Sequence, residues 1–195
     1  MTIRDRFRRV PESMGSVCLA SGLPAAAVSE ERSCFEAFQT EFDYLCRTLR
    51  RLGVPAHDIE DEVHEVFLVL NRKWGEYDSS RPLRPYLFGI AFRLVAGRKR
   101  RARRDVWRDP EDIGDDAPQP DEALEAAYAR ELVLRALDRV PLPRRAVLVM
   151  HDIDEIPMRS TAEALSIPLF TGYSRLRKAR KEFEAAVKLL QQGRL

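Results

Sequence analysis

An acidic segment that contains three prolines divides the sequence and limits what each side of it can fold into. The stretch DVWRDPEDIGDDAPQPDE, residues 105–122, has eight acidic residues, one arginine and three prolines. A stretch of this composition can neither bury a core nor continue as one helix. We therefore expect two small helical domains joined by an acidic flexible linker at residues 105–121.

Both sides of this linker show the apolar spacing of helices rather than the alternation of strands, which predicts an all-α fold. The chain has 195 residues, of which 45% are hydrophobic, enough for one or two small cores. We expect a poorly ordered extension at residues 1–35, because its apolar pattern is interrupted, followed by helical domains at 36–104 and 122–190.

Several classes of protein are disfavoured by the composition. No apolar run approaches the roughly 20 residues of a membrane helix, and Pro11 and Gly15 interrupt the stretch where a signal peptide would be apolar. The three cysteines are widely spaced, and the three histidines lack metal-ligand spacing. We expect a cytoplasmic protein with no membrane segment, no metal, no cofactor and no catalytic residues.

The helix expected at residues 57–74 has an apolar face and an acidic face. Apolar residues recur at three- and four-residue steps: Ile59, Val63, Val66, Phe67 and Leu70. Four acids are expected together on another side: Asp58, Asp61, Glu62 and Glu65. Acids suit a helix N-terminus, where Asp58 can act as the cap. Glu65 lies two turns in, so a basic protein partner explains this face equally well.

The next helix, expected from Pro85, changes from an amphipathic to a basic pattern. Its apolar residues form two adjacent stripes: Leu87, Ile90, Ala91 and Leu94, beside Phe88, Phe92 and Val95. After Val95 the apolar pattern stops, and six of the seven residues at 98–104 are Lys or Arg. Basic residues suit a helix C-terminus, but this density of charge is better explained by contact with nucleic-acid phosphates. Gly89 and Gly97 weaken the helix, and close packing of another segment against it would explain why glycine stands at these positions.

The C-terminal part predicts a helix-turn-helix. Short helices are expected around PRRAVLVMH and MRSTAEAL, followed by a tight SIP turn and a long basic helix from Thr171, the expected N-cap. Leu176, Ala179 and Phe183 have the spacing of a buried face. In such a motif the second helix presents its outward residues to the major groove. An exposed basic helix of a small bundle has the same periodicity, so both interpretations stay open.

Two blocks, in this order and at this spacing, resemble the conserved regions of bacterial sigma factors, the promoter-recognition subunits of RNA polymerase. DIEDEVHEVFLVL followed by PYLFGIAFRLVAGRKRRARR is similar to the second region. VPLPRRAVLVMHDIDEIP followed by AEALSIPLFTGYSRLRKARKEF is similar to the fourth. The presence of these two regions alone, joined by a short linker, resembles the extracytoplasmic-function (ECF) group of the sigma-70 family.

The resemblance implies a non-enzymatic factor that binds core RNA polymerase and confers promoter specificity. The acidic helix of the second region would dock on the clamp helices of the largest polymerase subunit through Asp58, Asp61, Glu62 and Glu65. The next helix and the preceding loop GEYDSSRP would bind and help open the −10 element. The DNA-binding residues implied there are Arg93, Arg98, Lys99, Arg100, Arg101, Arg103 and Arg104.

The fourth region would bind the −35 element, and its other surface would meet the polymerase flap. The residues implied in this DNA contact are Thr171, Tyr173, Ser174, Arg175, Arg177, Lys178, Arg180 and Lys181. The linker would run toward the RNA exit path. Members of the group are often held by an anti-sigma protein, although no residue here identifies one.

The sequence departs from the family pattern at several positions. Tyr86 stands where Trp is common, and His64 where Gln is usual. In the helix-turn-helix, the usual Glu-Ile-Ala reads Ser160-Thr161-Ala162, the turn Gly is Ser166, and a buried Val is Gly172. A hydroxyl at Thr161 and a missing side chain at Gly172 predict a motif weakened by a few kcal/mol.

Two other functions explain part of the sequence. A helix-turn-helix regulator that binds duplex DNA as a dimer without polymerase would use the C-terminal part but gives no role to residues 57–104. A nuclease would hold Mg²⁺ through Asp58, Asp61 and Glu65. These three acids lie on consecutive turns of one predicted helix without a matching carboxylate motif, which is unlike a two-metal site.

Overall fold

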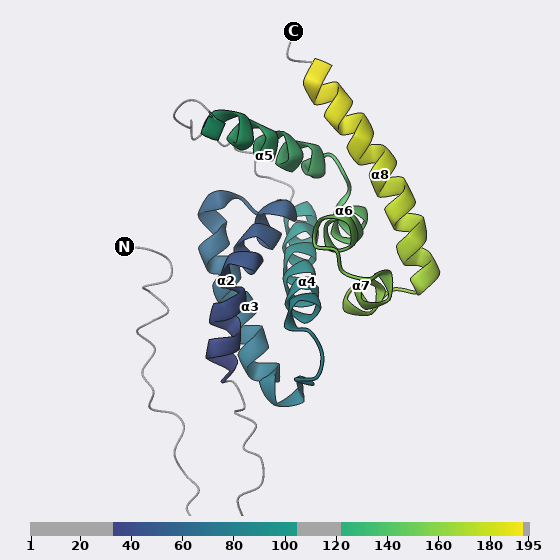
Figure 1. Cartoon of the computed structure of the whole chain (residues 1–195). Helices are drawn as coiled ribbons and strands as arrows, with labels where there is room; N and C mark the ends of the chain where they lie inside the picture. The colour runs from purple at the N-terminus through teal and green to yellow at the C-terminus, as the bar shows by residue number, and fades with distance from the viewer. Residues whose placement is uncertain (1–32, 105–121, 193–195) are drawn as a thin grey trace, which may run out of the picture.

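Every element in the described part of the chain is helical. The computed structural model describes residues 33–104 and 122–192 (Figure 1). The first stretch forms α2 (Cys34–Arg51), η1 (Ala56–Asp58), α3 (Ile59–Lys73), η2 (Trp74–Glu76) and α4 (Leu83–Arg104). The second forms α5 (Glu122–Asp138), α6 (Leu142–Leu148), η3 (Val149–Ile153), α7 (Met158–Ala164) and α8 (Leu169–Gln192). The all-α prediction is confirmed; the predicted linker and nearly all of the N-terminal extension lie outside the described residues.

The sequence Ser-Cys-Phe-Glu fixes the beginning of α2. The Glu36 backbone N–H donates to the Ser33 hydroxyl at 3.2 Å, and the Ser33 backbone N–H donates to the Glu36 carboxylate at 3.1 Å. This reciprocal pair satisfies two N–H groups that the first helical turn would leave without acceptors. The helix therefore begins at Cys34, slightly before residue 36, where the domain was expected to begin.

Helices α3 and α4 pack through apolar faces that the periodicity predicts. On α3, Ile59, Val63, Val66 and Leu70 are buried and Phe67 is partly buried. On α4, Leu87, Phe88 and Ile90 are buried, which confirms a core position for Phe88. The helix begins at Leu83, two residues before Pro85. In this first helical unit, α2–α4, the apolar pattern identifies core positions on α3 and α4, whereas Phe92 and Leu94 of the predicted stripes are only partly buried.

In the second helical unit, α5–α8, the long helix α8 packs against α5, α6 and α7 (Figure 1). Leu176 and Ala179 are buried as expected. Thr171 is not the N-cap, because α8 begins at Leu169 and the Gly172 N–H already donates to the Pro168 carbonyl at 3.1 Å. Proline suits a helix start because its missing N–H would have no helical acceptor there.

The two helical units pack together and share one apolar core. Core residues of α2 and α4 belong to the same cluster as Leu137 of α5 and Met150 of η3. Around this core, Asp154 accepts a hydrogen bond from Arg51 Nη1 at 2.7 Å and one from the Tyr44 hydroxyl at 3.0 Å. Burial raises the pKa of Asp154, and its bonds to Tyr44 and Arg51 oppose that rise.

Arg145 fixes the corner between α5 and α6. Its side chain is 3% exposed, and it donates to the Asp138 carboxylate at 2.6 Å and to the carbonyls of Asp138 and Val140 at 2.7 and 3.1 Å. Gly53, with φ +85°, brings the end of α2 to this corner, where a Cβ would lie 2.7 Å from the Asp138 carboxylate.

Among the described helices, none is long and apolar enough to span a membrane.

Candidate functional site

The acidic side chains of α3 do not all share one face. Asp61 and Glu65 are exposed one turn apart, on the outer side of the helix. Glu62 is only 3% exposed, because it lies three residues after Ile59 and four before Val66, on the side that packs inward. The predicted acidic face therefore does not include Glu62. Of the four acids predicted for this face, Asp61 and Glu65 are the two that are exposed.

Arg98 of α4 binds the other two acids. Its Nη1 donates to Asp58 Oδ2 at 2.7 Å, and its Nη2 pairs with the Glu62 carboxylate. Burial raises the pKa of Glu62, while the charge of Arg98 opposes this rise. Asp58 makes no capping bond with its side chain, so the expected capping role is wrong. In this structure Arg98 joins α4 to α3.

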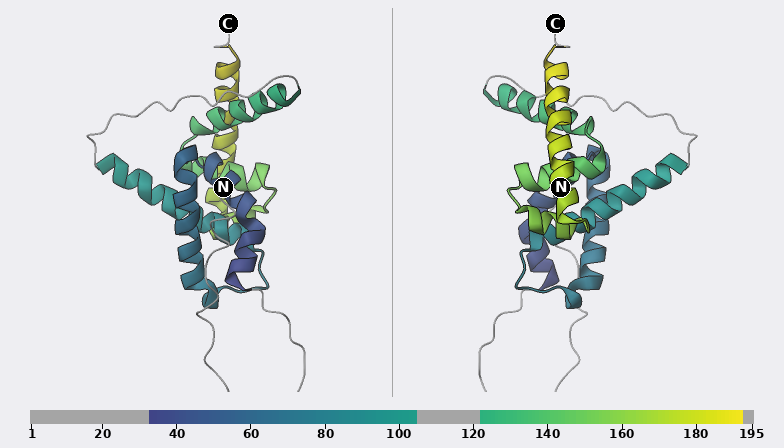
Figure 2. Two further views of the ribbon diagram at one scale, coloured as in Figure 1. Left: turned by 90° about the vertical axis from the view of Figure 1, so that its left-hand side faces the viewer. Right: turned by 90° about the vertical axis from the view of Figure 1, so that its right-hand side faces the viewer.

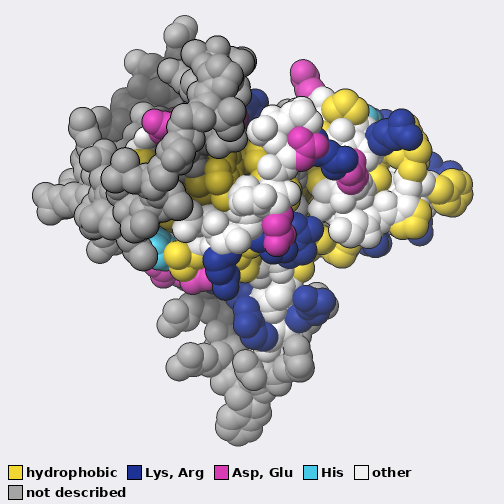
Figure 3. Space-filling view, turned by 90° about the horizontal axis from the view of Figure 1, so that it is seen from below, with side chains coloured by type: hydrophobic (Ala, Val, Ile, Leu, Met, Phe, Trp, Pro, Cys, Tyr) yellow, Lys and Arg dark blue, Asp and Glu magenta, His cyan; other side chains and the backbone are white. Residues whose placement is uncertain are grey.

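The basic end of α4 extends away from the packed helices (Figure 2). Arg100 and Arg101 are exposed, whereas Lys99 is half-buried and engaged in an interaction. Figure 3 shows Lys and Arg side chains gathered where the molecule projects at the bottom of the view. The side chains of Arg103 and Arg104 lie outside the described part of the structure. The exposed charges of Arg100 and Arg101 can approach a polyanion without rearrangement of the fold.

Arg93 and Gly89 lie where α4 crosses α7. Arg93 Nη1 donates to the Ala164 carbonyl at 3.2 Å. A Cβ at Gly89 would lie 2.7 Å from the same carbonyl oxygen, so the glycine permits this close approach. The packing reason considered for Gly89 is thus confirmed. Gly97 has a different environment, because the nearest atom to its Cβ position is Arg101 Nη2 at 4.0 Å.

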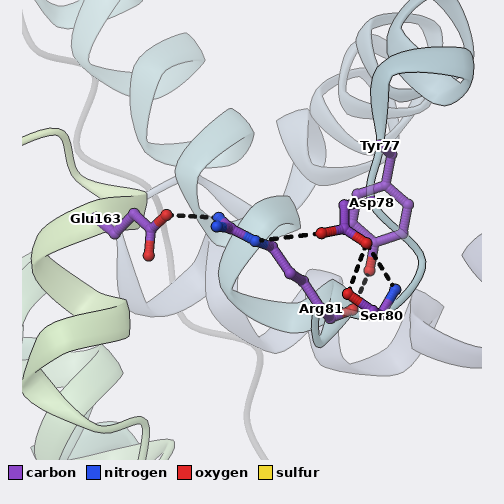
Figure 4. A network of polar contacts seen from close by, with 5 residues as sticks. All are labelled: Tyr77, Asp78, Ser80, Arg81 and Glu163. Atoms are coloured by element: carbon purple, nitrogen blue, oxygen red, sulfur yellow. Dashed lines mark hydrogen bonds and ion pairs between the residues drawn. The ribbon is translucent and has the colours of Figure 1, made fainter.

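The loop before α4 forms a cavity with α7. The cavity has a volume of about 660 Å³, and Tyr77, Tyr86 and Arg93 are among its lining residues. Figure 4 shows Arg81 of this loop bound to Asp78 on one side and to Glu163 of α7 on the other. The loop that the family resemblance assigns to the −10 element is therefore held against the helix-turn-helix.

The unusual residues of the helix-turn-helix have compensating neighbours. Met158 Sδ lies 2.8 Å from the position that a Cβ on Gly172 would occupy, so Met158 takes up that space. Thr161 is fully buried, and its hydroxyl donates to the Ile156 carbonyl at 3.3 Å. Ser166 adopts φ +54°, the left-handed conformation that a turn glycine would have. The structure thus shows a side chain that fills the space at Gly172 and an acceptor for the Thr161 hydroxyl.

The outward side of α8 presents some of the predicted DNA-binding residues to solvent. Tyr173, Arg177, Lys178 and Lys181 are exposed, while Thr171, Ser174 and Arg175 are half-buried. Arg180 is exposed but forms two contacts with the Asp152 carboxylate, each of 2.7 Å. These hydrogen bonds lower the pKa of Asp152.

Two exposed apolar residues at the beginning of α8 were not predicted as part of this surface. Leu169 is 46% exposed and Phe170 84% exposed. The sequence could have indicated their exposure, because both residues directly follow Pro168 and precede the apolar spacing that buries Leu176 and Ala179.

The three acids considered for Mg²⁺ do not form a metal site. Within residues 33–104 and 122–192, no group of three or more His, Cys, Asp or Glu side chains is arranged to hold a metal ion.

Comparison with known proteins matches both halves of the chain to one family. Residues 38–105 match Sigma-70 region 2, and residues 130–183 match Sigma-70, region 4. The chain is 24% identical over 172 residues to RNA polymerase sigma factor NccH of Alcaligenes xylosoxydans xylosoxydans, with 85% of this chain and 92% of NccH covered. It is 27% identical over 172 residues to ECF RNA polymerase sigma factor SigM of Mycobacterium tuberculosis, with 88% and 86% covered.

A solved structure supports the fold. The sigma factor RpoE, crystallised in complex with the anti-sigma factor NepR from Bartonella quintana, matches with a TM-score of 0.57 at 17% identity. The match covers 77% of this chain and 96% of that one. Both conserved regions are present in the family order, and the matched relatives are covered over most of their length. The chain therefore belongs to the sigma-70 family of RNA polymerase sigma factors, in its extracytoplasmic-function group.

Proposed function

We propose that this sigma factor uses the exposed acids of α3 to bind core RNA polymerase and two basic surfaces to bind promoter DNA. ECF sigma factors direct the polymerase to promoters, and the presence of both sigma regions carries the assignment of that function here. The exposed pair Asp61 and Glu65 supports the polymerase contact, because two carboxylates one turn apart suit a basic partner. Asp58 and Glu62 support this surface indirectly by anchoring α4.

The proposed −10 contact consists of the end of α4 and the loop before it. Arg100 and Arg101 are exposed on the projecting turns, where they can displace counterions from phosphates. Arg93 and Arg81 join this surface after they leave their contacts with α7. The proposed −35 contact is the outward side of α8, because a second helix of this motif enters the major groove.

Binding both promoter elements requires the two helical units to separate. Centres about 25 base pairs apart are separated by about 85 Å of duplex, at 3.4 Å per step. A compact chain of 195 residues has a radius of gyration of only about 16 Å. The 17 residues between α4 and α5 can span up to about 60 Å when extended. The packed arrangement therefore belongs to a state before promoter binding.

Charge reversal tests the polymerase surface. The variant Asp61→Lys/Glu65→Lys should bind core polymerase more weakly, because it replaces two exposed acids with repelling charges. A matched control, Glu131→Lys/Glu184→Lys, makes the same charge change at exposed positions on α5 and α8. Binding is measured by titration of labelled sigma factor with core polymerase, and circular dichroism verifies the fold. Wild-type affinity of the Asp61→Lys/Glu65→Lys variant would remove α3 from the interface.

The protein acts in the cytoplasm, where core polymerase and promoter DNA are found, and it contributes no catalytic group of its own. RpoE, which has a similar fold, was crystallised in complex with an anti-sigma factor, and this supports an anti-sigma protein as a further partner of this chain. Sigma factors as a family are initiation factors rather than enzymes.

A further inference from the structure

The start of α8 exposes a cluster of large apolar side chains. Phe170 is 84% exposed, Tyr173 54% and Leu169 46%. Phe170 has the largest exposed fraction among the large hydrophobic side chains in the described residues. Burying such a side chain is worth about 1.5–3 kcal/mol, so the fold forgoes a substantial gain by leaving it in water.

The helix geometry places Phe170 on the solvent side of α8. Phe170 precedes buried Gly172 by two residues, which places the two about 200° apart around the helix axis. Tyr173 and Arg177 follow at steps of three and seven residues, and both are exposed on the same side. Phe170 is therefore directed away from α7 and the core, at the end of a stripe that becomes basic.

The surroundings of the cluster favour a polyanion as its occupant. The first turn of α8 has no acidic residue. Farther along the helix, Arg177, Lys178 and Lys181 are exposed. In Figure 3, hydrophobic and basic side chains occur together at the right-hand edge, on the side where α7 and α8 lie in Figure 1. Duplex DNA combines phosphates with one apolar group in its major groove, the 5-methyl group of thymine.

We propose that Phe170 determines −35 specificity by packing its ring against a thymine methyl group in the major groove. This inference rests on the proposed function, because it requires α8 to bind the −35 element. The position of Phe170 suits the role, since residues at the N-terminal end of a recognition helix contact base edges. Tyr173, one turn on, flanks the same contact, and the exposed basic residues bind the adjacent backbone.

Replacement of thymine by deoxyuridine tests the contact, because it removes only the methyl group. Holoenzyme containing the wild-type protein first selects binding sites from duplexes with a randomised −35 segment. Each selected thymine is then replaced singly by deoxyuridine. At one position the replacement should lower wild-type affinity about fourfold, as expected for one buried methyl-sized group. Phe170→Ala should bind the thymine and deoxyuridine duplexes equally.

The matched control is Leu189→Ala, which removes a side chain that is 55% exposed near the other end of the same helix. It should keep the thymine preference. The inference is overturned if the wild type does not distinguish the two bases, or if Phe170→Ala still does. It is also overturned if Phe170→Ala instead loses polymerase binding, which would make the cluster a protein-docking surface. Failure of the wild-type holoenzyme to select any sequence would count against the proposed function itself.

Discussion

Gly89→Ala is expected to push the two helical units apart. A Cβ at this position would lie 2.7 Å from the Ala164 carbonyl oxygen, which is closer than a carbon and an oxygen normally approach. The obstructing atom belongs to the backbone of α7, so a side-chain rotation cannot relieve the contact. Arg93 donates to the same carbonyl, and the clash therefore affects the contact that holds α7 on α4.

The expected magnitude comes from two opposing effects. Alanine stabilises a helix interior by up to about 1 kcal/mol relative to glycine. Overpacking costs about 1–3 kcal/mol, which would shift the equilibrium between packed and separated units by about 5- to 150-fold. Gly97→Ala provides the matched control on the same helix, because its nearest neighbour is the end of a flexible arginine at 4.0 Å. The control should show only the helix gain.

Small-angle X-ray scattering measures the separation, and chemical denaturation measures stability. Gly89→Ala should have a larger radius of gyration than the wild type, whereas Gly97→Ala should keep the wild-type value and unfold at a higher denaturant concentration. Since binding of both promoter elements requires separated units, Gly89→Ala should retain promoter binding in the holoenzyme. An unchanged radius of gyration together with the same gain in stability as the control would refute the tight packing of α4 on α7.

Three further perturbations test contacts within the structure by denaturation. Arg98→Ala should lower the free energy of unfolding by about 1–3 kcal/mol, because it leaves a buried carboxylate without its partner, whereas Arg100→Ala should change it by less than about 0.5 kcal/mol. Met158→Ala should cost about 2–5 kcal/mol, and Gly172→Val added to it should restore part of the loss by refilling the space. The contribution of Asp154 to the unfolding free energy should fall as pH rises from about 4 through its raised pKa, so the wild type should lose stability relative to Asp154→Asn over this interval.

Different results would contradict each expectation. Equal stability of Arg98→Ala and Arg100→Ala would mean that the buried glutamate does not need its partner. Additive effects of the Met158 and Gly172 substitutions would mean that a side chain at position 172 does not enter the space that Met158 fills. The sign for Asp154 follows because its folded pKa is raised, so the native state binds more protons than the unfolded state in that interval. Parallel pH profiles of the wild type and Asp154→Asn would contradict it.

The core of each helical unit could be predicted from the sequence because it depends on local spacing. The apolar steps on α3 and α4 identify buried residues such as Val63 and Phe88. Glu62 was assigned by charge to an acidic face, although its spacing from Ile59 and Val66 already placed it inward. Where residue type and spacing disagreed, spacing predicted the position correctly.

Contacts between distant segments could not be predicted in this way. Met158 fills the space beside Gly172 across two helices, so the sequence departure at Gly172 indicated a loss without showing its compensation. The acidic segment indicated two separate units, but it carries no information about the fit of Gly89 on the Ala164 carbonyl. Such contacts depend on the crossing of helices rather than on the pattern within one helix.

The central claim is most directly tested with core RNA polymerase free of other sigma factors. The purified protein is mixed with this core enzyme, isolated as a complex, and supplied with a pool of promoter-containing DNA fragments for transcription. The account predicts stable association and initiation at a discrete set of start sites. Failure to associate, together with tight and specific binding of duplex DNA by the protein alone, would contradict the account and indicate an independent helix-turn-helix regulator.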